Sequence, residues 1–209
     1  MRPAALLLDF NGTLSDDEHI QYEIYREIFA EVGKPLDETS YFAQLAGLSD
    51  PEIVRTWLGE ERPDLVAERV RRYQERAADG STIGREARDA VRFAAERARL
   101  AVVSGAARVE IESVLRAARL AAFVSVIVSA EDVVAGKPDP EGYNVALRLL
   151  ESQADEGVAV EDSEAGVAAA KAAGLYCVAL EGTMTAARLG EADELVGALD
   201  VELMQRLLG

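Results

Sequence analysis

Five short apolar runs constrain the fold of this 209-residue chain more than any other feature of its sequence. Each run is rich in Val, Leu, Ile or Ala and shows no alternation of apolar with polar residues. Such a pattern is typical of parallel strands that are covered on both faces. The runs are Ala4–Leu8, Leu100–Ser104, Phe123–Ser129, Gly157–Val160 and Leu175–Leu180.

Helical periodicity fills the intervals between the last four runs, over Ala107–Ala118, Glu141–Leu150 and Ala165–Ala173. Strands that alternate with helices are typical of an α/β fold with helices on both faces of the sheet. The sequence therefore predicts a Rossmann-like, doubly wound parallel sheet.

The interval between the first and second runs is much longer than the others. From Asp16 to Arg85 the pattern is helical throughout, as in "IQYEIYREIFAEVG", and contains no strand candidate. The segment is too long for one crossover helix, so we expect an all-α domain inserted after the first strand. The predicted limits are 1–15 and 86–209 for the α/β core and 16–85 for the insertion, with Gly80, Ser81 and Gly84 at the return hinge.

The acidic composition limits the partners of the chain. It has 22 Lys and Arg against 38 Asp and Glu, a net charge of −16. This charge repels phosphate backbones and anionic membranes, so we expect neither nucleic acid nor a membrane as a partner. No apolar run approaches the roughly 20 residues that cross a bilayer, and the N-terminal run is too short for a signal peptide. We therefore expect a cytoplasmic protein, in which Cys177, the single cysteine, is a buried apolar side chain.

Polar side chains follow the apolar runs at the points where the predicted strands end. Ligands of open parallel sheets bind at the carboxyl ends of the strands, so these side chains form one candidate site. The set consists of Asp9 with Asn11, Ser104, Glu161 with Asp162, and Lys137 from the loop after the third strand. Carboxylates, a hydroxyl and an ammonium group in one place suit a phosphate group and a metal ion.

The carboxylates of this set are candidate ligands of Mg²⁺. Asp9 and Asp162 offer the oxygen atoms that this ion prefers, the backbone carbonyl of Asn11 offers another, and Glu161 can orient bound water. Clustered carboxylates repel one another unless a cation lies among them. The alternative is that Asp162 and Ser163 only cap the helix that follows, and both interpretations stay open at this point.

Lys137 and Ser104 are candidate phosphate ligands. Lys137 is one of three lysines beside 19 arginines, and the neighbouring Gly136 and Pro138 indicate a shaped loop rather than an ordinary surface position. Ser104 precedes Gly105 near the start of a predicted helix, where a hydroxyl and the helix N-terminus both favour an anion. An ordinary helix cap is the alternative for Ser104.

Other catalytic arrangements find little support in the sequence. His19 is the only histidine, and we expect it on the surface at the start of a helix. One histidine that lies beside an acidic cluster gives no basis for a Ser-His-Asp triad. Neither "GxxxxGK[ST]" nor "GxGxxG" occurs, so the phosphate-binding loops of nucleotide-binding folds are not predicted.

Four motifs in order give the chain a specific resemblance. They are "DFNGTL" at Asp9–Leu14, Ser104 after "LAVV", Lys137 in "GKPDPEGY", and "VEDSEAGVAAAKAAG" with Glu161 and Asp162. The chain resembles the haloacid dehalogenase superfamily, in the branch with a small helical cap that includes phosphoglycolate phosphatase and β-phosphoglucomutase. The resemblance covers nearly the whole chain and implies that residues 16–85 form this cap.

The resemblance implies a Mg²⁺-dependent phosphohydrolase that acts on a small phosphorylated metabolite. Asp9 would attack the phosphoryl group and form an aspartyl-phosphate, a reaction that depends on positioning and electrostatics. The implied phosphate-binding set is Thr13, Ser104, Gly105 and Lys137. Dehalogenases of the superfamily do not use Mg²⁺, so the presence of Glu161 and Asp162 favours phosphoryl transfer.

Asn11 departs from the pattern of the family. Phosphatases and phosphomutases carry there a second Asp that protonates the leaving group and then activates water. The loss of a general acid/base typically costs about 10²–10⁴-fold in rate. The sequence therefore predicts a slow enzyme, a leaving group that needs little protonation, as in acyl or aryl phosphates, or a substitute acid such as Asp16 or Asp17. The competing hypothesis is a phosphate-binding or regulatory protein with little or no turnover.

Two relatives within the family are less favoured. Sugar-phosphate mutases carry a histidine and an arginine in the cap where this chain has Gln21 and Asp50. Phosphonate-cleaving members use a cap lysine, and Lys34 at an expected helix end is the only lysine in the cap. The cap offers Arg26 and Arg55 as possible substrate contacts, and it leaves open both the substrate and the choice between monomer and dimer.

Overall fold

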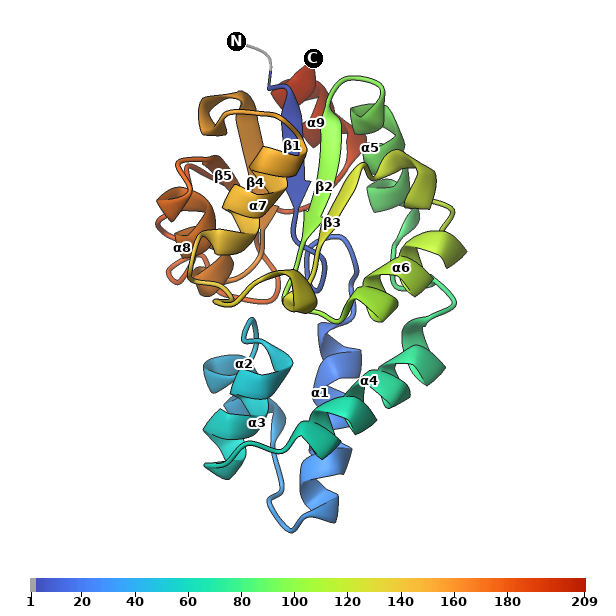
Figure 1. The fold of residues 1–209 in the computed structure, drawn as a ribbon, viewed down its shortest axis with the longest axis vertical. Coiled ribbons are helices and arrows are strands. Elements are labelled where there is room, and N and C mark those ends of the chain that lie inside the picture. The colour runs from blue at the N-terminus through green and yellow to red at the C-terminus, as the bar shows by residue number, and fades with distance from the viewer. Residues whose placement is uncertain (1–2) are drawn as a thin grey trace.

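A parallel sheet forms the centre of the molecule, in a computed structural model that describes residues 3–209 (Figure 1). Within these residues the sheet has six strands in the order β3-β2-β1-β4-β5-β6, and all five pairings are parallel. The strands are β1 (Ala5–Leu8), β2 (Arg99–Val103), β3 (Val126–Val128), β4 (Gly157–Glu161), β5 (Tyr176–Leu180) and β6 (Glu194–Val196). The predicted α/β class and the five predicted strands are confirmed. The short strand β6 was not predicted.

The register of the sheet brings the strand ends to one level. Leu8 of β1 pairs with Val102 of β2 on one side and with Val160 of β4 on the other. The residues that follow these positions therefore emerge at the same edge of the sheet. This register is the reason why Asp9 and Asp162, 153 positions apart in sequence, can lie in one site.

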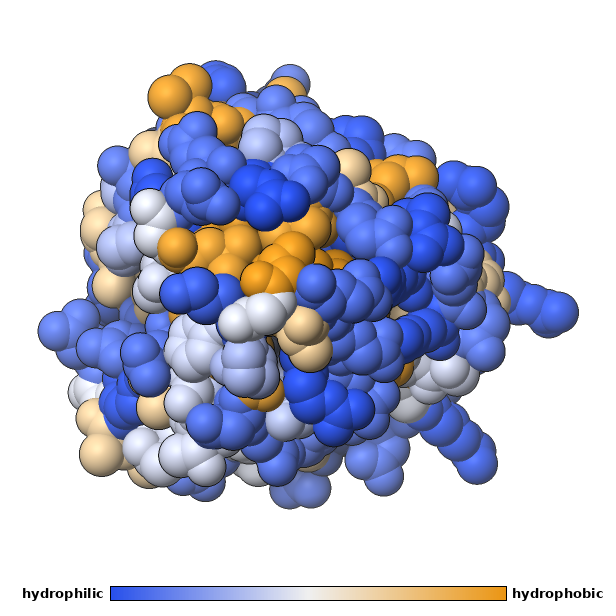
Figure 2. All heavy atoms as spheres, turned by 90° about the horizontal axis from the view of Figure 1, so that it is seen from below, coloured by the Kyte–Doolittle hydropathy of each residue, from blue (hydrophilic) through white to orange (hydrophobic). Residues whose placement is uncertain are grey.

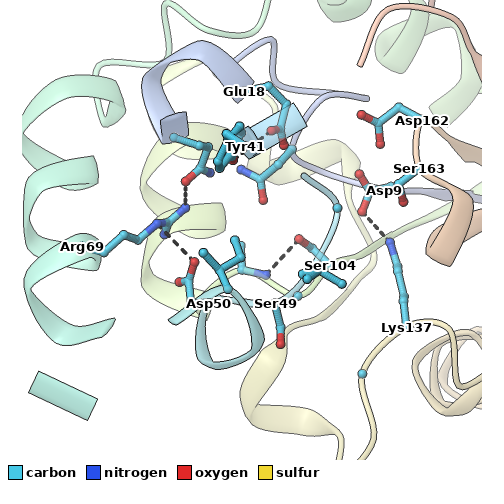
Figure 3. Close-up of a pocket in the computed structure, with 18 residues that line it drawn as sticks. Asp9, Glu18, Tyr41, Ser49, Asp50, Arg69, Ser104, Lys137, Asp162 and Ser163 are labelled. Carbon is cyan, nitrogen blue, oxygen red and sulfur yellow. Dashed lines mark hydrogen bonds and ion pairs between the residues drawn. The ribbon is translucent and has the colours of Figure 1, made fainter. Parts of the chain in front are cut away.

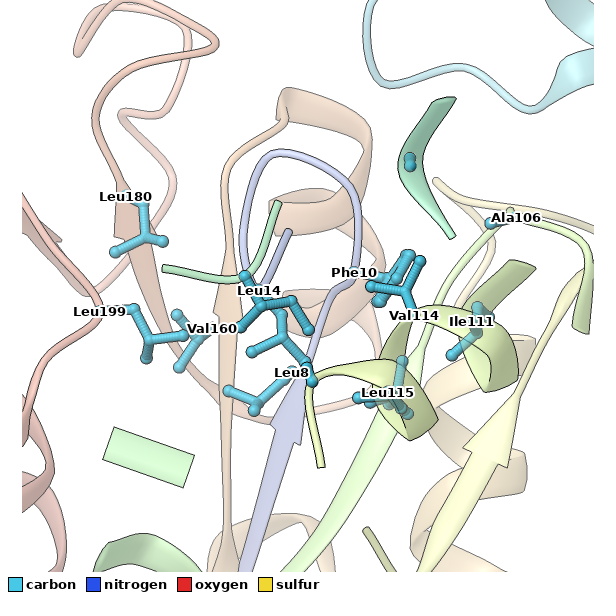
Figure 4. Close-up of a cluster of buried hydrophobic side chains, with 14 of the residues drawn as sticks. Leu8, Phe10, Leu14, Ala106, Ile111, Val114, Leu115, Val160, Leu180 and Leu199 are labelled. Carbon is cyan, nitrogen blue, oxygen red and sulfur yellow. The ribbon is translucent and has the colours of Figure 1, made fainter. Parts of the chain in front are cut away.

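Helices cover both faces of the sheet. Leu6 and Leu8 belong to a buried apolar cluster with α5 (Arg85–Ala95), α6 (Arg108–Ala117) and α9 (Val201–Leu208), part of which is drawn in Figure 4. Ala5 and Leu7 point to the opposite face and belong to a second cluster with α7 (Glu141–Leu149) and α8 (Glu164–Ala172). Successive side chains of β1 thus pack into two different apolar cores, one on each face of the sheet. This explains why the sequence of β1 is apolar throughout.

The long interval after β1 forms four helices that lie beyond the carboxyl ends of the strands (Figure 1). They are α1 (Glu18–Glu31), α2 (Glu38–Gln44), α3 (Asp50–Leu58) and α4 (Pro63–Ala77), and we call them the cap. Aromatic side chains fill the space between them, with Tyr25, Phe29 and Tyr41 buried. The domain limits of 1–15 and 86–209 for the core and 16–85 for the cap remain our proposal.

Short 3₁₀ helices and one buried cysteine are further features of the described residues. Short 3₁₀ helices lie at Ala121–Phe123, Ala130–Asp132 and Ala154–Glu156. Cys177 is buried, as predicted. Within residues 3–209 we find no helix with the length and apolar character that a membrane span requires. Seen from the cap end, the surface is mostly hydrophilic, with an apolar area near its centre (Figure 2).

The packing around β1 predicts a large effect of a core truncation. We expect Leu8→Ala to lower the free energy of unfolding by about 2–5 kcal/mol, because Leu8 is fully buried and its loss leaves a cavity. The same change at Leu149, which is 56% exposed, should alter this free energy by about 0.5 kcal/mol at most. Urea unfolding followed by circular dichroism measures both, and equal losses would contradict the packing described here.

Candidate active site

A pocket of about 70 Å³ lies between the strand ends and the cap (Figure 3). The core side is lined by the loops that follow β1, β2, β3 and β4, and the cap side by residues of α1, α2, α3 and α4 or of the loops between them. The sequence-predicted residues in this lining are Asp9, Asn11, Ser104, Gly105, Lys137 and Asp162. The topology therefore brings together most of the set that the strand ends suggested.

Lys137 is the centre of the ionic contacts in this pocket. Its Nζ donates to Asp9 Oδ1 at 2.5 Å and lies 2.6 Å from Glu161 Oε1. Burial opposes the charge of Lys137, but the carboxylates of Asp9 and Glu161 outweigh this effect and raise its pKa above the usual value. The loop that carries Lys137 is thereby fixed against β1 and β4.

Glu161 has a contact that the sequence did not predict. It is fully buried, and the hydroxyl of Tyr143 donates to its Oε1 at 2.5 Å. Burial raises the pKa of Glu161 to about 7, against the lowering effect of Lys137. The other oxygen of Glu161, Oε2, accepts from Asp162 N and Ser163 Oγ at 3.4 Å. The role of Glu161 in orienting water at a metal ion stays a prediction.

Three carboxylates lie close enough to share a cation. Asp9, Glu161 and Asp162 each offer an oxygen atom, and these atoms lie within 4.8 Å of one another. Burial, followed by the charges of Asp9, Glu18 and Glu161, raises the pKa of Asp162 well above its usual value. Buried carboxylate oxygens in this arrangement are a donor set that suits Mg²⁺.

Gly12 allows Asp162 to approach the loop after β1. A Cβ atom at Gly12 would lie 1.9 Å from Asp162 Oδ2, and the residue has a φ of +74°. A side chain there would displace the carboxylate and strain the backbone. The glycine of the "DFNGTL" segment therefore serves the acidic cluster directly.

Neither Asp162 nor Ser104 is the N-cap of the helix that follows it. Ser163 is the N-cap of α8, and its Oγ accepts from Gly166 N at 3.1 Å, so Asp162 does not cap this helix. Helix α6 starts only at Arg108, and the Oγ of Ser104 accepts from Ala106 N at 3.1 Å. The hydroxyl proton of Ser104 is thus left to donate to a ligand in the pocket.

Asn11 is held by a carboxylate of the core–cap junction. Its Nδ2 donates to Asp17 Oδ2 at 3.0 Å, and this oxygen also accepts from Ser15 Oγ at 2.7 Å and from the hydroxyl of Tyr73. Burial raises the pKa of Asp17 to about 6, although all three donors lower it. With one hydrogen of its amide nitrogen bonded to Asp17, Asn11 keeps its side-chain carbonyl oxygen as a hydrogen-bond acceptor.

Three residues that the sequence suggested for the site, Thr13, Asp16 and Asp17, do not line this pocket. Asp16 and Asp17 are absent from the pocket lining, because Asp16 is exposed beside a separate pocket and Asp17 is tied to Asn11. Thr13 also lines that separate pocket, and within the described chain its buried Oγ1 has no hydrogen-bond partner. The predicted contact of Thr13 with a phosphate group stays a prediction.

Glu18 lines the pocket and was not predicted. It is the first residue of α1, and its Oε2 accepts from the Tyr41 hydroxyl at 3.0 Å. Burial, then the charge of Asp17, raises the pKa of Glu18 to about 8. The run "SDDE" contained the signal, but the sequence did not reveal which of its acids faces the pocket.

Arg69 of α4 is the second pocket residue that sequence reasoning missed. It is only 2% exposed, it lies 3.3 Å from Asp50 (Nε to Oδ1), and its Nη1 donates to Glu110 Oε2 of α6 at 2.6 Å. Its Nη2 also donates to Gln21. Gln21 and Asp50, which argued against a mutase, therefore both hold an arginine that comes from another helix.

The other candidate cap residues lie outside this pocket. Arg26 lies over the ring of Tyr22, and Arg55 lines an adjacent cavity. Lys34 is exposed after the end of α1 and is not part of the lining. His19 is exposed at the start of α1, as predicted.

Comparison with known proteins identifies the family. Residues 6–180 match the family model described as haloacid dehalogenase-like hydrolase. The chain belongs to this family. As a haloacid dehalogenase-like hydrolase it is an enzyme, which agrees with the resemblance found in its motifs.

Named relatives share most of the length of this hydrolase. It is 32% identical to validoxylamine A 7'-phosphate phosphatase of Streptomyces hygroscopicus subsp. limoneus over 91% of each chain. It is 30% identical to a phosphorylated carbohydrates phosphatase of Thermotoga maritima over 82% of each chain. The crystal structure of a CbbY variant from Rhodobacter sphaeroides with xylulose-(1,5)bisphosphate matches with a TM-score of 0.84 and 29% identity over 96% of each chain.

The buried cluster around Arg69 predicts a pH-dependent loss of stability. Burial raises the pKa of Glu110 to about 7, so the folded state binds this proton more tightly than the unfolded state, and stability falls as the pH rises through 7. Arg69→Met removes the cation that stabilises the ionised form of Glu110 against the effect of burial. We expect it to lower the free energy of unfolding by about 3–5 kcal/mol at pH 8 and by less at pH 5, where Glu110 is protonated.

Arg71→Met is the matched control for this prediction. Arg71 lies on the same helix and pairs with Glu68 and Glu75 at the surface, where solvent screens the charges and such pairs add little to stability. Urea unfolding at both pH values compares the two variants. A loss at Arg69 that is small, or equal at pH 5 and pH 8, would contradict the buried ion cluster.

Proposed function

We propose that this hydrolase is a Mg²⁺-dependent phosphatase that acts on a small phosphorylated metabolite through an aspartyl-phosphate. The pairing of Asp9 with Lys137, beside Asp162, in a pocket closed by the cap is the observation that carries the proposal. The names of the relatives support it, since two of them are phosphatases of phosphorylated carbohydrates or of a phosphorylated natural product.

The first step is an attack by Asp9 on phosphorus. Lys137 holds Oδ1 of Asp9, which leaves Oδ2 for the attack. Ser104 and the backbone at Gly105 line the place where the phosphoryl oxygens would lie. Asp9 and Asp162, with the backbone carbonyl of Asn11, would hold Mg²⁺, which when bound neutralises charge on the phosphoryl group.

The second step is attack of water on the phosphorus of the aspartyl-phosphate, which frees Asp9 and inorganic phosphate. The carbonyl oxygen of Asn11 can accept a hydrogen bond from this water, because the amide nitrogen is committed to Asp17. An amide cannot remove the proton, so this contact orients the water without activating it.

The cap side of the pocket indicates the kind of leaving group. Glu18, Gln21, Tyr41, Ser49 and Asp50 line it, and all of them can hydrogen-bond to hydroxyl groups. Arg69 is already balanced by carboxylates and offers little attraction to a second anion. We therefore propose a hydroxylated metabolite with one phosphate group, such as a sugar or polyol phosphate.

A phosphate-binding protein without turnover is the alternative function. Asn11 is the feature that favours it, since the residue cannot act as a general acid or base. The contacts of Asp9 and Lys137 argue against it, because a binding site for phosphate gains nothing from a carboxylate aimed at the anion.

Phosphate release from acetyl phosphate and para-nitrophenyl phosphate tests the function. We expect Mg²⁺-dependent turnover that disappears with EDTA and falls about 10³-fold or more in Asp9→Asn, which lacks the nucleophile. Asp16→Asn is the matched control, because Asp16 is exposed outside the pocket. Release no faster than that of Asp9→Asn would overturn the proposal in favour of phosphate binding alone.

The contact between Asn11 and Asp17 gives a separate prediction. Asn11→Asp places a second carboxylate against Asp17, so one of the two must keep a proton. We expect this variant to lose about 1–3 kcal/mol of stability at pH 8 relative to pH 5, and we expect Asp17→Asn in the same chain to remove that pH dependence. Urea unfolding of the single and double variants measures the coupling, and additive effects would exclude it.

A further inference from the structure

We propose that Glu18 is the general acid and base of this enzyme. Asn11 cannot take this role, because an amide neither gives up nor accepts the proton. The inference deepens the proposed phosphatase function and rests on it. Glu18 lies at the point where the chain leaves the core and enters the cap. It lines the same pocket as Asp9, Asn11 and Lys137.

The position of Glu18 suits transfer of a proton to the leaving oxygen. Figure 3 shows Glu18 and Tyr41 along one side of the pocket, between Arg69 of the cap and Asp9 of the core. A phosphate ester attacked by Asp9 must extend its leaving group toward the cap, since the core occupies the other sides. The leaving oxygen then passes the side on which Glu18 lies.

Glu18 differs from the other carboxylates of the lining in its contacts. Asp9 is paired with Lys137, and Asp50 contacts Arg69 and accepts from the Tyr25 hydroxyl at 2.6 Å. Asp162 belongs to the acidic cluster that suits the metal. Among the described residues that line the pocket, this leaves Glu18 as the carboxylic acid without a cation or a predicted metal role.

Tyr41 determines which oxygen of Glu18 can carry the proton. The Tyr41 hydroxyl donates to Oε2 at 3.0 Å, and burial raises the pKa of Tyr41 well above its usual value, so it stays a donor. The proton of Glu18 therefore belongs on Oε1. Tyr41 is buried on α2, so this contact also fixes the side chain of Glu18 relative to the cap.

The charges around Glu18 favour its neutral form. Asp17 on the same junction and Asp9 at the end of β1 both raise its pKa, while Tyr41 of α2 and Arg69 of α4 lower it. Asp162, in the loop after β4, interacts with it as a like charge. Burial is the largest effect, and together these groups keep the carboxyl protonated near neutral pH, as a general acid requires.

The proton balance of the reaction is complete with this residue. As an oxygen of Asp9 bonds to phosphorus, the bond to the leaving oxygen breaks, and that oxygen takes its electron pair and the proton from Glu18. The carboxylate of Glu18 then removes a proton from the attacking water, as the bond between Asp9 and phosphorus breaks. The products are an alcohol, inorganic phosphate and the enzyme in its starting protonation state.

The dependence on the leaving group tests Glu18. We compare Glu18→Gln with the natural protein on glycerol 2-phosphate, whose alkoxide leaves poorly, and on acetyl phosphate, whose leaving group needs little protonation. Expected is a fall in kcat/KM of about 10²–10⁴-fold for the alkyl ester and of less than about tenfold for the acyl phosphate. Glu23→Gln, an exposed position on the same helix, is the control.

The pH profile of the natural protein is the second measurement, and it needs no variant. With the alkyl ester, kcat/KM should fall on the alkaline side as Glu18 loses its proton, and this limb should be absent in Glu18→Gln. An equal loss on both substrates, an unchanged alkaline limb, or a natural protein that hydrolyses acetyl phosphate but not the alkyl ester would overturn the role of Glu18. Failure of the natural protein on both substrates would instead overturn the proposed phosphatase function.

Discussion

The buried ion pairs of Lys137 with Asp9 and Glu161 are the constraint on which the rest of the site depends. Charged groups are costly to bury unless they are paired, and here one ammonium group serves two carboxylates on neighbouring strands. The parallel pairing of β1 with β4 places these carboxylates side by side. Loss of Lys137 would leave both without a cation, so the loop, the sheet edge and the orientation of Asp9 depend on a single side chain.

The sequence predicted most of the α/β core and the pocket residues that belong to it, because the carboxyl ends of strands in a parallel sheet meet at one edge. Asp9, Ser104 and Lys137 were found in this way. The cap was different, since helical periodicity predicts helices but not which faces of two helices meet. Arg69 and Glu18 owe their places to such packing. The strand β6 was missed because only two of its three residues, Leu195 and Val196, are apolar, and acidic residues precede them, so no continuous apolar run marks it.

Asn11 and Asp17 illustrate how a site can keep its polar character when one residue changes. A carboxylate at position 11 would stand against that of Asp17, which lies 3.0 Å from the present amide. The amide instead donates to Asp17 and keeps one oxygen atom as an acceptor. The negative charge therefore lies behind the pocket, where Ser15 and Tyr73 stabilise it, and the pocket itself carries less charge than the usual pair of aspartates would give it.

Charge balance then links the proton on Glu18 to the binding of substrate. The lining holds Asp9, Asp50 and Asp162, whereas its cations, Lys137 and Arg69, are already paired with carboxylates. A phosphate group that enters such a pocket needs further positive charge, or less negative charge, than these residues supply. A divalent cation bound among the carboxylates would supply the positive charge, and the proton that we propose on Glu18 would lower the negative charge. The proton proposed for the leaving group thus also reduces the repulsion that the substrate meets on entry.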